Sequence, residues 1–98
     1  MEKFGIQITQ SAVDDLDSIP NDLRKKILPD IKNLSSNPFP SGSSIKKLKG
    51  FKRPLYRLRS GDFRILYRVE SHTITIMRVI NRKELERVIK RLKLNRSF

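Results

Sequence analysis

Cysteine is absent from this 98-residue sequence, which excludes disulfide bonds, thiol catalysis and cysteine-based zinc sites. Long apolar runs are absent too, because no stretch approaches the ~20 residues that a transmembrane helix needs. The first five residues lack the charged-then-apolar order of a signal peptide. We therefore expect a cytoplasmic protein with no membrane association, no metal ion and no small-molecule cofactor.

Positive charge is abundant and unevenly distributed. The chain carries 22 Lys and Arg against 10 Asp and Glu, a net charge of +12. Residues 1–44 hold 5 basic and 6 acidic residues, whereas residues 45–98 hold 17 basic and 4 acidic residues. A field of this kind attracts polyanions and binds phosphate through counterion release. Solubility alone needs a net charge of only about 2–8, so the excess favours a nucleic acid, RNA above all, or an acidic protein as partner.

The first half of the chain predicts one strand and two helices. Apolar and polar residues alternate over residues 4–8, which is typical of a short strand. Ser11 is a suitable cap for a first helix, and Pro20 separates it from a second amphipathic segment. Pro29 lies inside the second helical pattern, where it removes a backbone donor, so we expect a kink or a break there. Residues 35–44 have the composition of a loop.

The second half predicts three strands. From residue 45 onward the apolar period changes to two. Strand-like segments at 55–59, 63–69 and 73–80 are separated by short turns. Such turns join consecutive antiparallel strands, so these segments should form a meander.

A last helix follows the meander. Asn81 is a suitable N-cap, with Glu84 at the spacing of a capping box. The expected order is strand, two helices, three strands and helix. We therefore predict the α+β class and one domain over residues 1–98, with a helical hairpin covering an antiparallel sheet.

The meander should have an apolar face and an arginine face, because alternate side chains of a strand point to opposite sides. In the middle strand the apolar face, which we expect to pack on the helical hairpin, consists of Phe63, Ile65, Tyr67 and Val69. Arginines and nearby lysines on the other side can hold phosphate, arginine through two parallel hydrogen bonds. The predicted phosphate-binding residues are Arg57, Arg59, Arg64, Arg82, Lys46, Lys47, Lys49, Arg68 and Arg78.

The simpler interpretation is that strand arginines only solvate an exposed face of the sheet. Like charges on neighbouring strands repel one another and reduce stability. A fold that tolerates Arg57, Arg59 and Arg64 together therefore indicates a ligand that neutralises them.

Several segments resemble the RelE/ParE toxin superfamily. Residues 47–50 (K-L-K-G) and 55–67 (L-Y-R-L-R-S-G-D-F-R-I-L-Y) are similar to the family core "K-L-K-G … Y-R-I-R-x-G-D-Y-R-x-x-Y". Residues 78–84 (R-V-I-N-R-K-E) resemble its signature "I-x-H-R-R-[DE]-V-Y", and residues 34–38 resemble its "L-x-x-N-P" segment. The resemblance implies the compact RelE fold, a helical hairpin against a twisted antiparallel sheet.

The resemblance also implies an activity and a partner. Members similar to RelE cut messenger RNA, usually on the ribosome, when a 2′-hydroxyl attacks the adjacent phosphate and leaves a 2′,3′-cyclic phosphate. By position, the implied catalytic residues are Arg57, Arg59, Arg64 and Arg82. They would hold the scissile phosphate and stabilise charge in the transition state. The implied protein partner is an acidic antitoxin that wraps the toxin.

The sequence departs from the family pattern at residues that move protons. Asn81 stands where the family often has His, and Leu85-Glu86 stand where it often has Tyr. Arg59 cannot replace a lysine base, because arginine keeps its proton at neutral pH. The only histidine, His72, lies in a predicted turn. The remaining candidates for proton transfer are Lys47, Lys49, Tyr56 and Glu86.

Three functions therefore stay open. The set of four arginines favours an endoribonuclease toxin, acting on the ribosome or free. The lack of His and Tyr at the C-terminal signature favours a ParE-like toxin that binds and poisons a DNA topoisomerase. The third is a catalytically inactive nucleic-acid-binding module.

Overall fold

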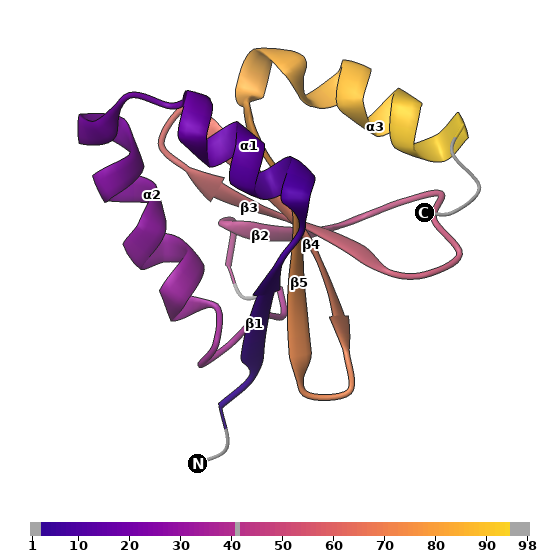
Figure 1. The fold of residues 1–98 in the computed structure, drawn as a ribbon. Coiled ribbons are helices and arrows are strands. Elements are labelled where there is room, and N and C mark those ends of the chain that lie inside the picture. Colours follow the sequence, from indigo (N-terminus) through magenta and orange to yellow (C-terminus); the bar gives the residue numbers. More distant parts are fainter. Residues whose placement is uncertain (1–2, 41, 95–98) are drawn as a thin grey trace.

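The computed structural model describes residues 3–40 and 42–94 of the chain. It contains a five-stranded, twisted sheet with helices on both faces (Figure 1). The elements in chain order are β1 (Gly5–Ile8), α1 (Gln10–Ser18), α2 (Asn21–Asn33), β2 (Ile45–Leu48), β3 (Leu55–Ser60), β4 (Phe63–Glu70), β5 (Thr73–Asn81), the 3-10 turn η1 (Arg82–Glu84) and α3 (Leu85–Leu94). The α+β prediction is confirmed. In this described part, no helix is long and apolar enough to cross a membrane.

The sheet is mixed, with strand order β1-β5-β4-β3-β2. Strands β2 to β5 pair antiparallel in succession, but β1 pairs parallel with β5. The predicted antiparallel meander is confirmed, but no partner or direction was predicted for the N-terminal strand, whose parallel pairing makes the sheet mixed. Apolar alternation identifies a strand and its faces, but it carries no information about direction when the partner strand lies far away in the sequence.

Strand β2 was missed in the sequence, where its lysines were placed just before the meander. It is an edge strand of four residues, and it pairs only with β3. Two lysines occupy its centre, and lysine on an edge discourages pairing with other chains. With apolar residues only at its two ends, this four-residue segment was too short to be identified as a separate strand.

Helices α1 and α2 cover one face of the sheet (Figure 1). Ile65 and Tyr67 of β4 are fully buried there, with Phe63 and Val69 packed at the margin. The predicted apolar face of β4 is confirmed. Ile27 is among the α2 residues that complete this core.

The sequence predicted a kink or a break at Pro29, and helix α2 does not break there but continues through this residue. Ile27 and Ile31 are buried on either side of this position, whereas Pro29 itself is exposed. Burial of both anchors offsets the backbone hydrogen bond that proline removes.

The opposite face of the sheet carries a second, smaller core under α3. Leu55, Leu66 and Ile80 of the sheet pack against Val88 and Leu92 of the helix. The sequence suggested a continuous cationic surface on this face, but the apolar patch under α3 interrupts it. The arginines of this face border an apolar patch that α3 covers.

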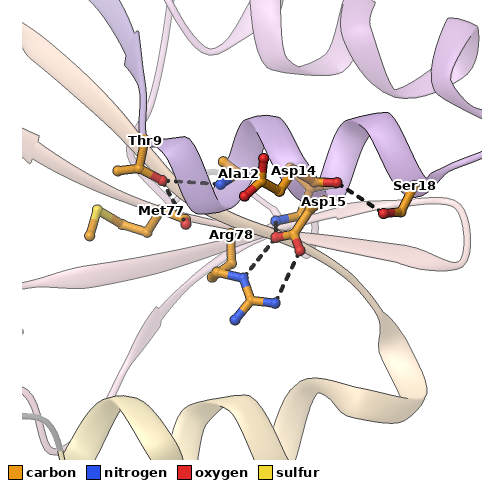
Figure 2. Close-up of polar contacts among 8 residues, drawn as sticks. Thr9, Ala12, Asp14, Asp15, Ser18, Met77 and Arg78 are labelled. Carbon is orange, nitrogen blue, oxygen red and sulfur yellow. Dashed lines mark hydrogen bonds and ion pairs between the residues drawn. The ribbon is translucent and has the colours of Figure 1, made fainter.

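Helix α1 begins at the edge of β5, where β1 ends. Thr9 caps the helix by accepting a hydrogen bond from Ala12 N, so the prediction of Ser11 as cap was wrong. The Thr9 hydroxyl also donates to Met77 O, and the Asp15 carboxylate accepts from Val79 N at 2.9 Å (Figure 2). Side chains of α1 thus satisfy the part of the β5 edge that β1 leaves unpaired.

Candidate phosphate-binding site

Arg57 and Arg59 of β3 lie beside Arg64 of β4 at the turn-proximal end of this strand pair. Arg59 is directly opposite Arg64, and Arg57 is opposite Leu66. Directly opposed side chains lie on the same face, with Cβ atoms about 4.5–5.5 Å apart. All three arginines therefore share the face that α3 partly covers.

Arg82 joins them from the end of β5. Its backbone N–H donates to Asp62 O at 2.8 Å, and its Nε lies 3.7 Å from the Asp62 carboxylate. Asp62 belongs to the tight β3–β4 turn, where Gly61 has a φ of 58°, a conformation that glycine adopts without strain. Arg82 is thus tethered to the turn that precedes Arg64.

The electrostatics of Arg64 show that these four side chains interact. Burial lowers the pKa of Arg64, and the positive charges of its three neighbours lower it further, against an opposing effect of Asp62. Those neighbours are Arg57, Arg59 and Arg82. We call these four residues the arginine cluster, a concentration of like charge that an anion would relieve.

The guanidinium of Arg64 is held at one end only. Its Nη1 donates to Gly61 O at 3.0 Å and to Phe63 O at 2.9 Å. Guanidinium has five N–H donors, so the other donors are available for a ligand. Backbone acceptors thus orient the group without neutralising it.

The three predicted lysines do not lie together, because two of them are on opposite faces of the sheet and the third is in a loop. Lys46 is opposite Arg57 and shares its face, whereas Lys47 is opposite Tyr56 and shares the face of the helical hairpin. Lys49 follows β2 in an exposed loop. Of the three, only Lys46 extends the face that holds the arginine cluster.

Arg68 and Arg78 do not belong to the arginine cluster, although Arg78 is opposite Leu66 and so shares the face of the cluster. Arg68 is 4% exposed and is opposite Thr75 near the far end of β4. Arg78 makes a two-pronged ion pair with Asp15, with Nε–Oδ2 at 2.7 Å and Nη2–Oδ1 at 3.0 Å (Figure 2). This hydrogen bonding raises the pKa of Arg78. The fold already uses the charge of Arg78 to attach α1 to β5.

The tyrosines lie away from the arginine cluster. Tyr56 and Tyr67 are buried on the face of the helical hairpin, where the rings stack with centroids 5.6 Å apart. The Tyr67 hydroxyl donates to Pro38 O at 2.7 Å, and burial raises its pKa. Neither phenol lies on the arginine side of the sheet.

Other proton-transfer candidates have structural roles or lie at a distance. Asn81 accepts from Lys83 N at 3.0 Å, which confirms it as a helix cap. His72 is in the β4–β5 turn, and its ring stacks on Phe4 at 5.4 Å. Glu86 is exposed in the first turn of α3. One carboxylate that the sequence assigned only to a turn, Asp62, lies beside the arginine cluster.

The sequence matches the family model described as "ParE toxin of type II toxin-antitoxin system" over residues 6–86. A curated relative from Methanocaldococcus jannaschii, named putative toxin RelE1, is 38% identical over 84 residues. The match covers 84% of this chain and 92% of that relative.

Solved structures show the same arrangement of elements. One is the archaeal RelE–RelB complex from Pyrococcus horikoshii OT3, with a TM-score of 0.69, 28% identity, and coverage of 82% of this chain and 96% of that chain. Another is the RelB–RelE antitoxin–toxin complex from Methanococcus jannaschii, with a TM-score of 0.67, 30% identity, and coverage of 84% and 96%. The α+β fold of the present chain matches the fold seen in both.

Proposed function

Because the chain belongs to the RelE/ParE superfamily of toxins from type II toxin–antitoxin systems, we propose that it is an endoribonuclease that cleaves messenger RNA on the ribosome. One observation carries this proposal. The β3–β4 register places Arg57 and Arg59 on the same face as Arg64, and the backbone bond from Arg82 N to Asp62 O holds Arg82 at the turn beside them. Such a site is suited to a phosphate that gains negative charge during a reaction.

The proposed reaction is an internal transfer at one phosphate of the RNA. The 2′-oxygen forms a bond to phosphorus, and the bond from phosphorus to the 5′-oxygen of the next nucleotide breaks. A proton leaves the 2′-hydroxyl, another reaches the departing 5′-oxygen, and the products are a 2′,3′-cyclic phosphate and a 5′-hydroxyl. In the transition state the non-bridging oxygens gain charge, which Arg64 and its neighbours stabilise by preorganised hydrogen bonds.

The arginine cluster supports charge stabilisation better than it supports proton transfer. Arginine keeps its proton at neutral pH, and neither tyrosine lies on this face. Lys46 shares the face with Arg57 and carries a group that can exchange a proton. We therefore propose that the arginines supply most of the rate enhancement and that Lys46 or solvent carries the protons.

We further propose an acidic antitoxin as the partner that inhibits this chain. Two of the similar solved structures are complexes of RelE with RelB. The present chain has 17 basic and 4 acidic residues after position 44. An acidic segment laid over the arginine cluster would neutralise it and block access of RNA.

The direct test is expression of the toxin in cells, followed by mapping of the 5′ ends of cellular RNA. New ends clustered within translated codons, and absent after expression of Arg64→Ala, are the expected result. Purified toxin should also release fragments that end in a 2′,3′-cyclic phosphate. Growth arrest with intact RNA would refute the ribonuclease proposal.

A second candidate function is poisoning of a DNA topoisomerase. It is favoured by the commitment of Asn81 to helix capping, at a position where the family often has His, and by the family model, which describes ParE. This function needs a charged docking surface but no proton transfer. Growth arrest with DNA damage and uncut RNA would select it.

A further inference from the structure

A hollow of about 270 Å³ lies on the other side of the turn that carries the arginine cluster. One wall comes from α2 and the other from the ends of β3, β4 and β5. The residues that matter for its chemistry are Leu23, Ile27, Asp30, Ser60, Phe63 and Asn81. We call this cavity the α2 hollow.

The α2 hollow has one organised polar pair, Ser60 and Asp30, beside apolar walls formed by Leu23, Ile27 and Phe63. The Ser60 hydroxyl donates to Asp30 Oδ2 at 2.5 Å, and Ser60 is only 5% exposed. This bond fixes the carboxylate against the wall. A carboxylate has about four acceptor positions, so Asp30 can still accept from a ligand that offers N–H groups.

The charges of the lining residues argue against an anionic ligand. Asp30 and Asp62 both border the α2 hollow, with Lys26 as the only cation among its lining residues. A phosphate or an acidic side chain would meet two carboxylates there. A flat apolar group with N–H donors on its edge, the chemistry of a nucleobase, fits both the apolar walls and the carboxylate.

The α2 hollow and the arginine cluster share the same short backbone segments. Ser60 follows Arg59, Phe63 precedes Arg64, and Asn81 precedes Arg82. Consecutive side chains of a strand point to opposite faces, so the phosphate-binding side and the hollow are separated by one layer of backbone. The β3–β4 pair ends at Gly61 and Asp62, where an RNA strand can pass around the turn.

We propose that the α2 hollow is a nucleobase subsite, and that Asp30 selects a base that donates N–H groups beside the phosphate held by the arginine cluster. Guanine is the best match, because its N1–H and N2–H donors are adjacent and can both reach one carboxylate. This inference rests on the proposed ribonuclease function and extends it to base preference.

The first test compares base preference in cleavage by wild type and Asp30→Asn. Asparagine keeps the shape and can still accept from Ser60, but it presents an NH₂ donor in place of a carboxylate oxygen. With a mixture of random RNA oligonucleotides, guanine should be enriched next to the cut for wild type. Asp30→Asn should reduce that enrichment about tenfold among the cuts that the variant still makes, the scale of one good base contact.

Asp22→Asn is the matched control, since it removes the same charge from an exposed position of α2. Its base profile should equal that of wild type. Cleavage by Asp30→Asn with the wild-type base profile would overturn the subsite and leave the ribonuclease function intact. Failure of the wild type to cut RNA would instead refute the ribonuclease function.

The second test does not depend on cleavage. The 5′-monophosphates of guanosine, adenosine, cytidine and uridine carry the same phosphate, so differences among them report on the base. Titration of the whole protein, followed by amide NMR, should shift Ser60 and Phe63 more with guanosine monophosphate than with uridine monophosphate. Asp30→Asn should remove that difference, and Asp22→Asn should keep it.

Two results of the titration would overturn the proposal. One is equal shifts at Ser60 and Phe63 for all four nucleotides. The other is absence of any shift there, together with protection of the same amides by an antitoxin peptide. The latter would assign the α2 hollow to a protein side chain.

Discussion

Arg59 and Arg64 face each other directly across the β3–β4 pair. Like charges in such a position destabilise a sheet, and hydrophobic packing on the two faces must offset that cost. The same arrangement places two positive charges on one face of the sheet, where the charge of Arg59 lowers the pKa of Arg64. The relationship is therefore unfavourable for the free protein and favourable for a complex with an anion.

Replacement of Arg64 tests the arginine cluster. Arg64→Ala should reduce RNA cleavage roughly 10²–10³-fold, the usual effect of losing one donor to a developing charge. Arg64→Lys should restore only part of the activity, because it restores charge without the two-pronged geometry. The melting temperature should change little in Arg64→Ala, since relief of repulsion offsets the loss of two hydrogen bonds to backbone carbonyls.

The matched control for this pair is Arg87→Ala. Arg87 is an exposed arginine of α3 whose ion pair is with Glu84 of the preceding turn η1. The Arg87→Ala variant should arrest growth and cleave RNA as the parent protein does. A folded Arg64→Ala protein that arrests growth as strongly as the parent would favour the topoisomerase alternative.

Ile65 tests the core beneath the helical hairpin. Ile65 is fully buried in β4, so Ile65→Ala should lower the free energy of unfolding by about 2–5 kcal/mol. Leu28→Ala is the control, because Leu28 of α2 is 45% exposed and should change stability by no more than ~0.5 kcal/mol. Urea denaturation measures both, and similar small values for the two variants would contradict the assignment of faces.

The pH dependence of stability should reveal the buried phenol of Tyr67. Burial raises its pKa above the ordinary value of 10.0, so above pH 10 the unfolded chain releases this proton before the folded protein does. The contribution is fully present below pH 10 and is lost as pH rises toward the folded pKa. Between pH 9 and about 11.5, the unfolding free energy of wild type should fall more steeply than that of Tyr67→Phe.

Tyr67→Phe will also lose the hydrogen bond to Pro38 O, which lowers stability by about 1 kcal/mol at all pH values. The diagnostic quantity is therefore the slope against pH and not the absolute stability. Parallel curves for the two proteins would show that Tyr67 ionises as easily in the folded protein as in the unfolded chain.

Antitoxin binding should depend on ionic strength. Charge attraction between an acidic partner and the basic second half is screened over about 10 Å at 0.1 M salt, so association should slow at least tenfold between low and high salt. Stopped-flow measurement of the association rate is the test. A rate that ignores ionic strength would mean that apolar contacts, and not the arginine cluster, guide the encounter.

Local features of the fold could be predicted from the sequence. The alternation around Ile65 and Tyr67 identified the apolar face of β4, and Asn81 was recognised as a cap. These predictions depend on neighbours in the chain. The parallel pairing of β1 and the short strand β2 depend on distant partners, so no local period indicates them.

The same distinction applies to the candidate site, where features set by neighbours in the chain could be predicted and contacts between distant residues could not. Arg57, Arg59 and Arg64 belong to a hairpin with a two-residue turn, so their common face follows from alternation alone. Arg78 shares that face, since it is opposite Leu66 and two positions before Ile80, which is opposite Arg64. Its ion pair is with Asp15, which is 63 positions away. No count along a strand could have found that contact.

Variants of the Asp15–Arg78 pair can therefore distinguish an arginine that stabilises the fold from the arginines that we propose to be catalytic. Side chains of Asp15 and Arg78 are 17% and 28% exposed, and removal of either should cost about 1.5–3 kcal/mol of stability, as for hydrogen bonds to charged groups. Arg78→Ala should lower the melting temperature, whereas Arg64→Ala should lower activity at nearly constant melting temperature. A double-mutant cycle with Asp15→Ala should show that the two losses are not additive, because each single change already breaks the pair. Additive losses would mean that Asp15 and Arg78 stabilise the fold through separate contacts. An Arg78→Ala protein with parental stability and no RNA cleavage would instead assign Arg78 to the phosphate site.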